Sequence, residues 1–268
     1  MQGEGPLVGS WAVVLGASSG IGAACAVAVA RAGADVAGVF LGRRQSRDTA
    51  TATGAAIEAA GRRWLPIRAN AADERGRIKA LDALGVALGS SGVRVLIHSL
   101  GFGSPARFIG AEASARGVPF PRQMEMTLDV MAHSLVYWTQ DLLAREMMGA
   151  GGRIIAMSSH GSHRVLPGYG AVGTAKAALE ANVRELAVEL APRGITVNAI
   201  RAGLTDTRAF RAIPTSGEML AHVNAIHPAG RITTPEDVAG AVVALCSPGC
   251  AWLTGNAISV DGGESIIG

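Results

Sequence analysis

The 268-residue sequence has few of the residues that build metal centres or disulfide frameworks. Its only cysteines are Cys25, Cys246 and Cys250, which form no paired framework, and no Cys/His spacing resembles a zinc site. We therefore expect no metal site and a reducing compartment. The 24 basic and 21 acidic residues are scattered, so the net charge of +3 provides no basic run of the kind that binds nucleic acid.

Long apolar runs are also missing. No stretch reaches the roughly 18 apolar residues that a membrane-spanning helix needs. Residues 1–11 have neither the basic segment nor the apolar segment of a secretion signal. We expect a cytoplasmic protein that binds no membrane. The hydrophobic content of 49% is enough for a large core, and we expect one domain over residues 1–268.

Short apolar runs alternate with helical segments along the chain. The apolar runs lie at residues 11–15, 35–40, 64–68, 94–98, 153–157, 195–200 and 257–260. Helices are expected at about 22–32, 46–60, 73–88, 123–148, 169–189 and 234–246. Continuous apolar runs indicate strands that are covered on both faces. The alternation predicts an α/β fold, a Rossmann-type doubly wound parallel sheet with helices on both faces.

A glycine-rich turn follows the first predicted strand and opens an Ala-rich helix. Its glycines have the spacing G-x-x-x-G-x-G. Glycine lets the backbone approach a pyrophosphate closely, and a helix N-terminus offers N–H groups and positive partial charge. The alternative is a plain structural turn. The flanking strand and helix favour a dinucleotide site formed by Gly16, Ser18, Ser19, Gly20, Ile21 and Gly22.

The end of the second predicted strand indicates which dinucleotide is bound. It offers no carboxylate for a ribose 2′-OH, and Arg43 and Arg44 follow instead. A guanidinium suits a 2′-phosphate, so NADP(H) is favoured over NAD(H). The alternative is two solvated arginines. Other candidate cofactor contacts at strand ends are Asn70, Ala71, Ser99, Leu100, Gly101, Gly203, Thr205 and Thr207.

A tyrosine and a lysine are candidates for the chemistry. Tyr169 and Lys176 are seven residues apart, a spacing that returns to nearly the same face of a helix. An ammonium nearby favours the phenolate and helps a phenol to transfer its proton at neutral pH. Ser159, at the end of the preceding strand, can donate a second hydrogen bond to the same oxyanion. The alternative is an ordinary surface helix.

Together these motifs resemble the short-chain dehydrogenase/reductase superfamily over about residues 8–267. The resemblance rests on Gly16–Gly22, His98–Gly101, Ser159, the Tyr/Lys helix, Val197-Asn198-Ala199 and Asp261-Gly262-Gly263. Two features depart from the common pattern. Val172 occupies the usual tyrosine position, four residues before Lys176, and the turn after the fourth strand begins with His98. The helix at 123–148 also contains no asparagine.

These departures are similar to the enoyl-(acyl-carrier-protein) reductases, which use Tyr-x6-Lys. Ser159 stands where their common bacterial type has a second tyrosine, and its surroundings resemble the NADPH-dependent third type. The resemblance implies that Tyr169 stabilises or protonates an enolate and that Lys176 holds the nicotinamide ribose and tunes Tyr169, with help from Ser159. It also implies an acyl thioester substrate, delivered on acyl carrier protein, and a homotetramer built through helices near 123–148 and 175–190.

The shifted tyrosine has a physical rationale. In ketone reduction the proton reaches the oxygen on the carbon that receives hydride. In enoyl-thioester reduction the hydride attacks C3, while negative charge develops on the thioester oxygen several bonds away. Moving the tyrosine three residues back displaces its anchor by about 4.5 Å, if the helix extends that far.

Residues 204–230 look like a mobile lid over this site. Arg208 and Arg211 lie in it and Arg201 just before it, and such a rim would attract an acidic carrier protein. Two other functions are open. One is a short-chain carbonyl reductase acting on a 3-oxoacyl thioester or another ketone, and the other is a cofactor-sensing protein without turnover.

Overall fold

Seven parallel strands form one sheet in this computed structural model, which describes residues 5–42, 44–103, 108–109, 121–166, 168–211 and 216–267. The strands are β1 (Trp11–Leu15), β2 (Asp35–Phe40), β3 (Trp64–Arg68), β4 (Val93–His98), β5 (Arg153–Ser159), β6 (Thr196–Ala202) and β7 (Ala257–Val260). Their order is β3-β2-β1-β4-β5-β6-β7. The order reverses between β1 and β4, so the loops after these strands diverge and leave a crevice at their carboxyl ends. The predicted doubly wound sheet is confirmed.

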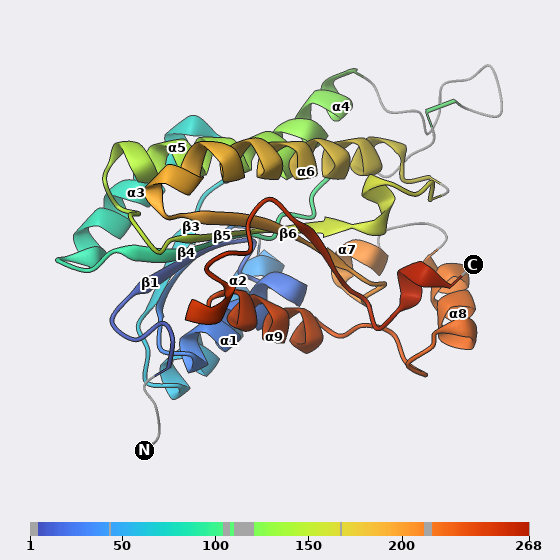
Figure 1. Ribbon diagram of the computed structural model, residues 1–268, viewed down its shortest axis with the longest axis horizontal. Helices are drawn as coiled ribbons and strands as arrows, with labels where there is room; N and C mark the ends of the chain where they lie inside the picture. The colour runs from blue at the N-terminus through green and yellow to red at the C-terminus, as the bar shows by residue number, and fades with distance from the viewer. Residues whose placement is uncertain are drawn as a thin grey trace.

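Helices cover both faces of the sheet (Figure 1). One face carries α3 (Glu74–Leu88), α5 (Ser134–Ala144) and α6 (Gly170–Leu190), and the other carries α1 (Gly20–Arg31), α2 (Arg44–Ala59) and α9 (Pro235–Leu245). Strand β1 is buried along its whole length because alternate residues face the two layers. Val13 and Leu15 pack in one hydrophobic core, and Ala12 and Val14 in the other.

The helix predicted at 123–148 is interrupted and ends earlier. It consists of α4 (Pro121–Leu128), a π-helical turn η1 (Asp129–His133) and α5. A π turn leaves backbone carbonyls without their usual helical partners. Side chains satisfy two of them here: Ser134 Oγ donates to Val130 O at 2.8 Å, and Asn182 Nδ2 on α6 donates to Ala132 O at 3.2 Å. Tertiary contacts therefore stabilise an irregularity that helical periodicity does not reveal.

The predicted lid at 204–230 contains two helices, α7 (Arg208–Arg211) and α8 (Ser216–Ile226), and residues 212–215 lie outside the described chain. Both ends of the lid are attached to the body of the protein. Thr205 forms a parallel bridge with Thr233. At the far end, His227 Nδ1 accepts a backbone N–H, so its Nε2 donates to Asp261 O at 3.0 Å. The mobility of the lid stays a prediction.

Within the described part of the chain, every helix is too short or too polar to span a lipid bilayer. The same residues contain no group of three or more His, Cys, Asp or Glu side chains arranged to hold a metal ion.

Candidate active site

The predicted phosphate-binding turn is packed too tightly for any residue but glycine at two positions. Gly16 has φ +90°, and a Cβ there would lie 2.2 Å from Ser99 O at the end of β4. A Cβ on Gly22 would lie 2.3 Å from Gly16 O. Helix α1 begins at Gly20, and Ser19 makes no side-chain cap for its first N–H groups. The turn therefore fits a pyrophosphate bound by backbone N–H groups.

The loops after β4 and β6 meet this turn. Leu100 lies against Gly16: its Cδ2 is 3.5 Å from the place that a Cβ added to Gly16 would occupy. Thr207 lies against Gly20: its Cγ2 is 3.3 Å from the place that a Cβ added to Gly20 would occupy. Thr205, in contrast, is buried, and its hydroxyl donates to Gly203 O at 2.9 Å. The structure thus brings Leu100 and Thr207 to the predicted cofactor turn, whereas Thr205 serves the loop itself.

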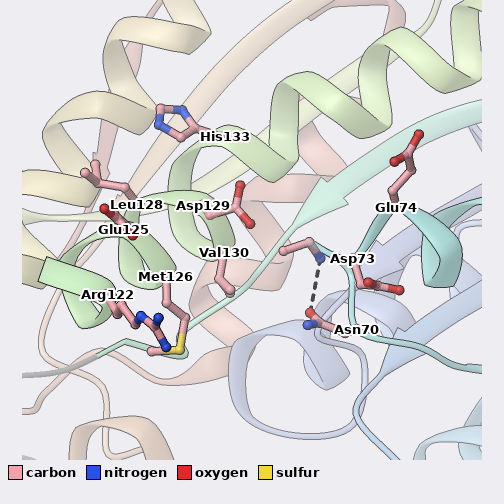
Figure 2. A pocket seen from close by; sticks show the side chains of 11 residues that line it. Asn70, Asp73, Glu74, Arg122, Glu125, Met126, Leu128, Asp129, Val130 and His133 are labelled. Carbon is pink, nitrogen blue, oxygen red and sulfur yellow. Dashed lines mark hydrogen bonds between the residues drawn. The ribbon is translucent and has the colours of Figure 1, made fainter.

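A cavity of about 740 Å³ lies beside the end of β3 (Figure 2). Asn70 lines it together with the start of α3 and residues of α4 and η1. The Asn70 Oδ1 accepts the Ala72 N–H at 3.2 Å, which fixes the turn. Ala71 is buried, and its carbonyl accepts Trp138 Nε1 at 2.8 Å. Of the two cofactor contacts predicted after the third strand, Asn70 is therefore the one that lines an open space.

The predicted 2′-phosphate site is only partly described, because Arg43 lies outside the described residues. Arg44 is exposed at the first position of α2. The structure adds Arg68, whose Cβ and Cδ lie 3.8 Å from the position of a Cβ on Gly42. Arg68 is the last residue of β3 and pairs in register with Phe40. Pairing of the second and third predicted strands places Arg68 beside the end of the second strand, so this pairing was the sequence signal that could have identified Arg68.

Tyr169 is the N-cap of α6 and not a residue of the helix, contrary to the sequence prediction. Its φ and ψ are −107° and 10°, and its carbonyl accepts the Gly173 N–H at 2.6 Å. The side chain is partly buried against a small hydrophobic cluster that includes Val130 and Met131. Val172 belongs to the same cluster and is 6% exposed. The position where most members of the superfamily carry tyrosine is thus a core position here.

The Tyr169 phenol is not converted to a phenolate by its surroundings. Burial raises the pKa of Tyr169 above its ordinary value, and the nearby Ser159 hydroxyl only partly opposes this rise. The Ser159 Oγ is buried and makes no hydrogen bond of normal geometry within the described residues. Ser159 is the side chain that opposes the effect of burial, and the tuning of Tyr169 by Lys176 stays a prediction. Tyr169 remains a neutral hydrogen-bond donor at physiological pH.

Lys176 is 5% exposed and is held by backbone carbonyls. Its Nζ donates to Met157 O on β5 at 2.6 Å and to Leu100 O, after β4, at 3.3 Å. Burial lowers the pKa of Lys176 to about 8, and the Glu180 carboxylate opposes this change. The ammonium therefore joins the carboxyl ends of β4 and β5, and β4 is one of the two strands between which the strand order reverses.

His98, which the sequence singled out only as part of a turn, is fully buried. Its Nε2 lies 2.8 Å from Ser134 Oγ, and Ser134 gives its own proton to Val130 O. The imidazole is therefore the donor to Ser134. Burial, followed by the Lys176 charge, lowers the pKa of His98 to about 3, so the ring is neutral and supports the loop above it.

The arginines of the predicted rim are engaged within the protein. Arg201 donates from Nε and Nη2 to the two oxygens of Glu180, at 2.8 and 2.5 Å. Arg211 donates to both oxygens of Asp206 at 2.7 Å. Arg201 and Arg211 of the predicted rim are thus each paired with a carboxylate of this chain, and attraction of a carrier protein to the rim stays a prediction. Only Arg208 of the three has no such carboxylate pair among the described residues.

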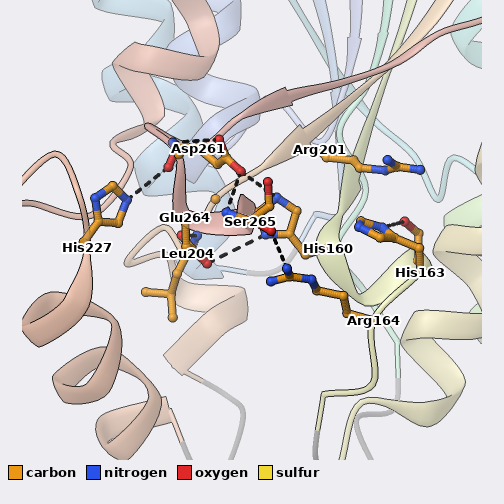
Figure 3. A network of polar contacts seen from close by, with 12 residues as sticks. His160, His163, Arg164, Arg201, Leu204, His227, Asp261, Glu264 and Ser265 are labelled. Atoms are coloured by element: carbon orange, nitrogen blue, oxygen red, sulfur yellow. Dashed lines mark hydrogen bonds and ion pairs between the residues drawn. The ribbon is translucent and has the colours of Figure 1, made fainter. Parts of the chain in front are cut away.

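A polar network joins the loops around the site to the C-terminal turn (Figure 3). His160 Nε2, one residue after Ser159, lies 3.1 Å from Asp261 Oδ2. Glu264 Oε2 accepts the Leu204 N–H at 2.7 Å. Arg164 donates to a backbone carbonyl of the same turn. The segment after β7 thereby holds the loops after β5 and β6 together.

Comparisons with known proteins agree with this fold. A family model described as enoyl-(acyl carrier protein) reductase matches residues 16–265. The enoyl-(acyl-carrier-protein) reductase (NADH) FabI of Aquifex aeolicus is 34% identical over 174 residues, 65% of this chain and 63% of that enzyme. This chain therefore spans somewhat less than two thirds of that relative. A crystal structure of the Aquifex aeolicus reductase superposes with a TM-score of 0.86, 27% identity and coverage of 98% and 99%.

A second relative, which is named for a CoA thioester, is matched over a larger share of its own length. The 1-cyclohexenylcarbonyl-CoA reductase of Streptomyces collinus is 31% identical over 258 residues, which cover 95% of this chain and 86% of that enzyme. The fold and these comparisons place the chain in the short-chain dehydrogenase/reductase superfamily of NAD(P)H-dependent oxidoreductases. Within it, the chain belongs to the enoyl-(acyl carrier protein) reductase family.

Proposed function

We propose that this protein reduces the 2,3 double bond of an enoyl thioester with NADPH. The observation that carries the proposal is the placement of the phenol. Tyr169 precedes α6, and Val172, one turn later, is buried in the core. The donor therefore sits farther back than a ketone reductase requires, which suits charge that develops on an oxygen remote from the carbon that accepts hydride.

Each residue has a role in this chemistry. The bound nicotinamide would supply the hydride that reaches C3. Tyr169, a neutral donor, hydrogen-bonds the thioester oxygen as it becomes an enolate oxygen. Ser159, whose buried Oγ has no other partner of normal geometry in the described chain, gives a second hydrogen bond. Lys176 would hold the nicotinamide ribose, and a proton delivered to C2 completes the reduction.

The preference for NADPH rests on Arg44, the first residue of α2, and on Arg68, the last residue of β3. Replacing both with alanine should lower kcat/KM for NADPH roughly 10–100-fold, because a bidentate guanidinium–phosphate contact is lost. The kcat/KM for NADH should change little, because NADH has no 2′-phosphate. Initial rates with both cofactors test this. A wild-type enzyme that uses NADH better, or equal losses with both cofactors, would contradict the assignment.

The acyl group of the substrate is carried by acyl carrier protein or by CoA. The family description favours acyl carrier protein, whereas the Streptomyces collinus relative is named for a CoA ester. The engaged Arg201 and Arg211 weaken the electrostatic argument for a carrier protein. Comparing crotonyl-CoA with crotonyl-(acyl carrier protein) at several salt concentrations tests it, since docking through surface charge requires a KM that rises with salt.

Reduction of a 3-oxoacyl thioester is the second candidate, favoured by Ser159, the residue that carbonyl reductases of the superfamily keep. One assay separates the functions: NADPH oxidation with a crotonyl thioester and, in parallel, with an acetoacetyl thioester. Turnover of the first supports enoyl reduction, and turnover of the second alone supports the carbonyl reductase. Turnover of neither supports a cofactor-sensing protein. A homotetramer and a cytoplasmic location stay predictions.

A further inference from the structure

A partly buried ion pair joins Glu180 on α6, the helix that carries Lys176, to Arg201 on β6. Glu180 follows Lys176 by four residues on α6, so the two side chains lie on one helical face, one turn apart. Glu180 is 5% exposed. Its Oε1 accepts from Ser158 Oγ at 2.6 Å, and Arg201 binds both carboxylate oxygens. One carboxylate therefore joins α6 to the ends of β5 and β6.

The position of this carboxylate connects it to the site. Ser158 and Arg201 are directly opposite each other in the β5–β6 ladder. Met157, just before Ser158, provides the carbonyl that holds Lys176 Nζ, and Ser159, just after it, lies near the Tyr169 hydroxyl. A movement of the end of β5 would displace the lysine and the serine together.

The charges around Lys176 are few. Glu180 on the same helix is the carboxylate that acts on it. Arg201 neutralises that carboxylate from β6, and His163 lies near both members of the pair. His98 faces Lys176 from β4 but is neutral. Burial acts to raise the pKa of Glu180, but bonds from Arg201 and Ser158 outweigh it and the net pKa is lowered, so the group is charged.

We propose that Glu180 and Arg201 are positioning residues for the reduction proposed above. The pair fixes the carboxyl end of β5 against α6, and the balance of its two charges keeps the ammonium of Lys176 in place beside the cofactor. The expected effect on turnover rests on the proposed function. The expected effect on the pKa of Lys176 does not depend on which reaction the protein catalyses.

The charge balance is tested without turnover. The chain has two lysines, Lys79 and Lys176, so ¹³Cε-lysine labelling gives two signals, and Lys79→Arg assigns them. Titration by NMR should place the pKa of Lys176 in Glu180→Gln roughly one unit below the wild-type value, because the carboxylate is lost. In Arg201→Gln it should be higher than in the wild type, because Glu180 is no longer neutralised. Shifts in the same direction, or none, would overturn the proposal.

Turnover is measured on whichever thioester the wild type reduces. Both glutamine variants should lose roughly 10–100-fold in kcat, because misplaced catalytic groups are costly. The alkaline limb of the pH profile of kcat should follow the pKa of Lys176. It should therefore shift to lower pH in Glu180→Gln and to higher pH in Arg201→Gln. If the wild type reduces neither thioester, the proposed function fails while the titration still decides the charge balance.

Two further variants separate positioning from general stability. Ser158→Ala keeps both charges and removes one bond to Glu180, so it should fold if the glutamine variants do not, and it should lower kcat without moving the alkaline limb. Arg145→Gln removes an ion pair between Arg145, at the C-terminal end of α5, and Asp82 on α3 (2.6 Å), and it should leave kcat unchanged. Equal kcat losses in Arg145→Gln and Arg201→Gln, or an unaffected Ser158→Ala, would refute the positioning role.

Discussion

Tyr169→Phe should lower kcat roughly 10²–10⁴-fold, the range typical of a positioned acid–base or oxyanion-binding group. The change removes one oxygen and leaves the ring packed against its cluster, so NADPH binding should be nearly intact. Burial raises the pKa of Tyr169, so the phenol stays protonated at neutral pH and its ionisation should not limit turnover there. Steady-state kinetics with a crotonyl thioester and fluorescence titration of NADPH provide the measurements.

The chain offers a matched control for this variant. Tyr137 is the only other tyrosine, and its hydroxyl donates to Asp129 Oδ1 at 3.1 Å. Tyr137→Phe removes the same atom and should leave kcat within a small factor of the wild type. Unchanged turnover in Tyr169→Phe, or equal losses in the two variants, would eliminate the proposed role of Tyr169.

Lys176→Met should lower kcat/KM roughly 10²–10³-fold and weaken NADPH binding, because the ammonium that joins the ends of β4 and β5 is lost. The variant also predicts how stability depends on pH. The pKa of Lys176 is about 8 in the fold and 10.5 without its surroundings, so between these values the unfolded chain binds more protons. Wild-type stability relative to the variant should therefore rise with pH across that window, by at most about 3 kcal/mol.

Urea unfolding at pH values across this window measures the difference. Lys79, exposed on α3, is the other lysine, and Lys79→Met is the matched control. This control should keep its activity and its affinity for NADPH. A constant difference between wild type and Lys176→Met would show that Lys176 does not titrate as its burial requires, and unchanged NADPH binding would remove its role at the ribose.

Several features were predictable because their causes are local in sequence. The apolar runs give the strands, and their alternation with helices gives the parallel sheet. Gly16 and Gly22 mark the tight turn because only glycine fits the close approach of backbone atoms there. The spacing of Tyr169 and Lys176, with Val172 between them, resembles the Tyr-x6-Lys motif of the enoyl reductases, and the family model confirms that family.

The features that only the tertiary structure decided depend on residues distant in the chain. Helical spacing placed Tyr169 on the same face as Lys176, yet the helix starts one residue later and the ammonium points to Met157 O, a carbonyl of β5. The sequence alone did not reveal that Arg201 is engaged by Glu180. Strand register and burial set these contacts, and burial also sets the direction in which each pKa moves.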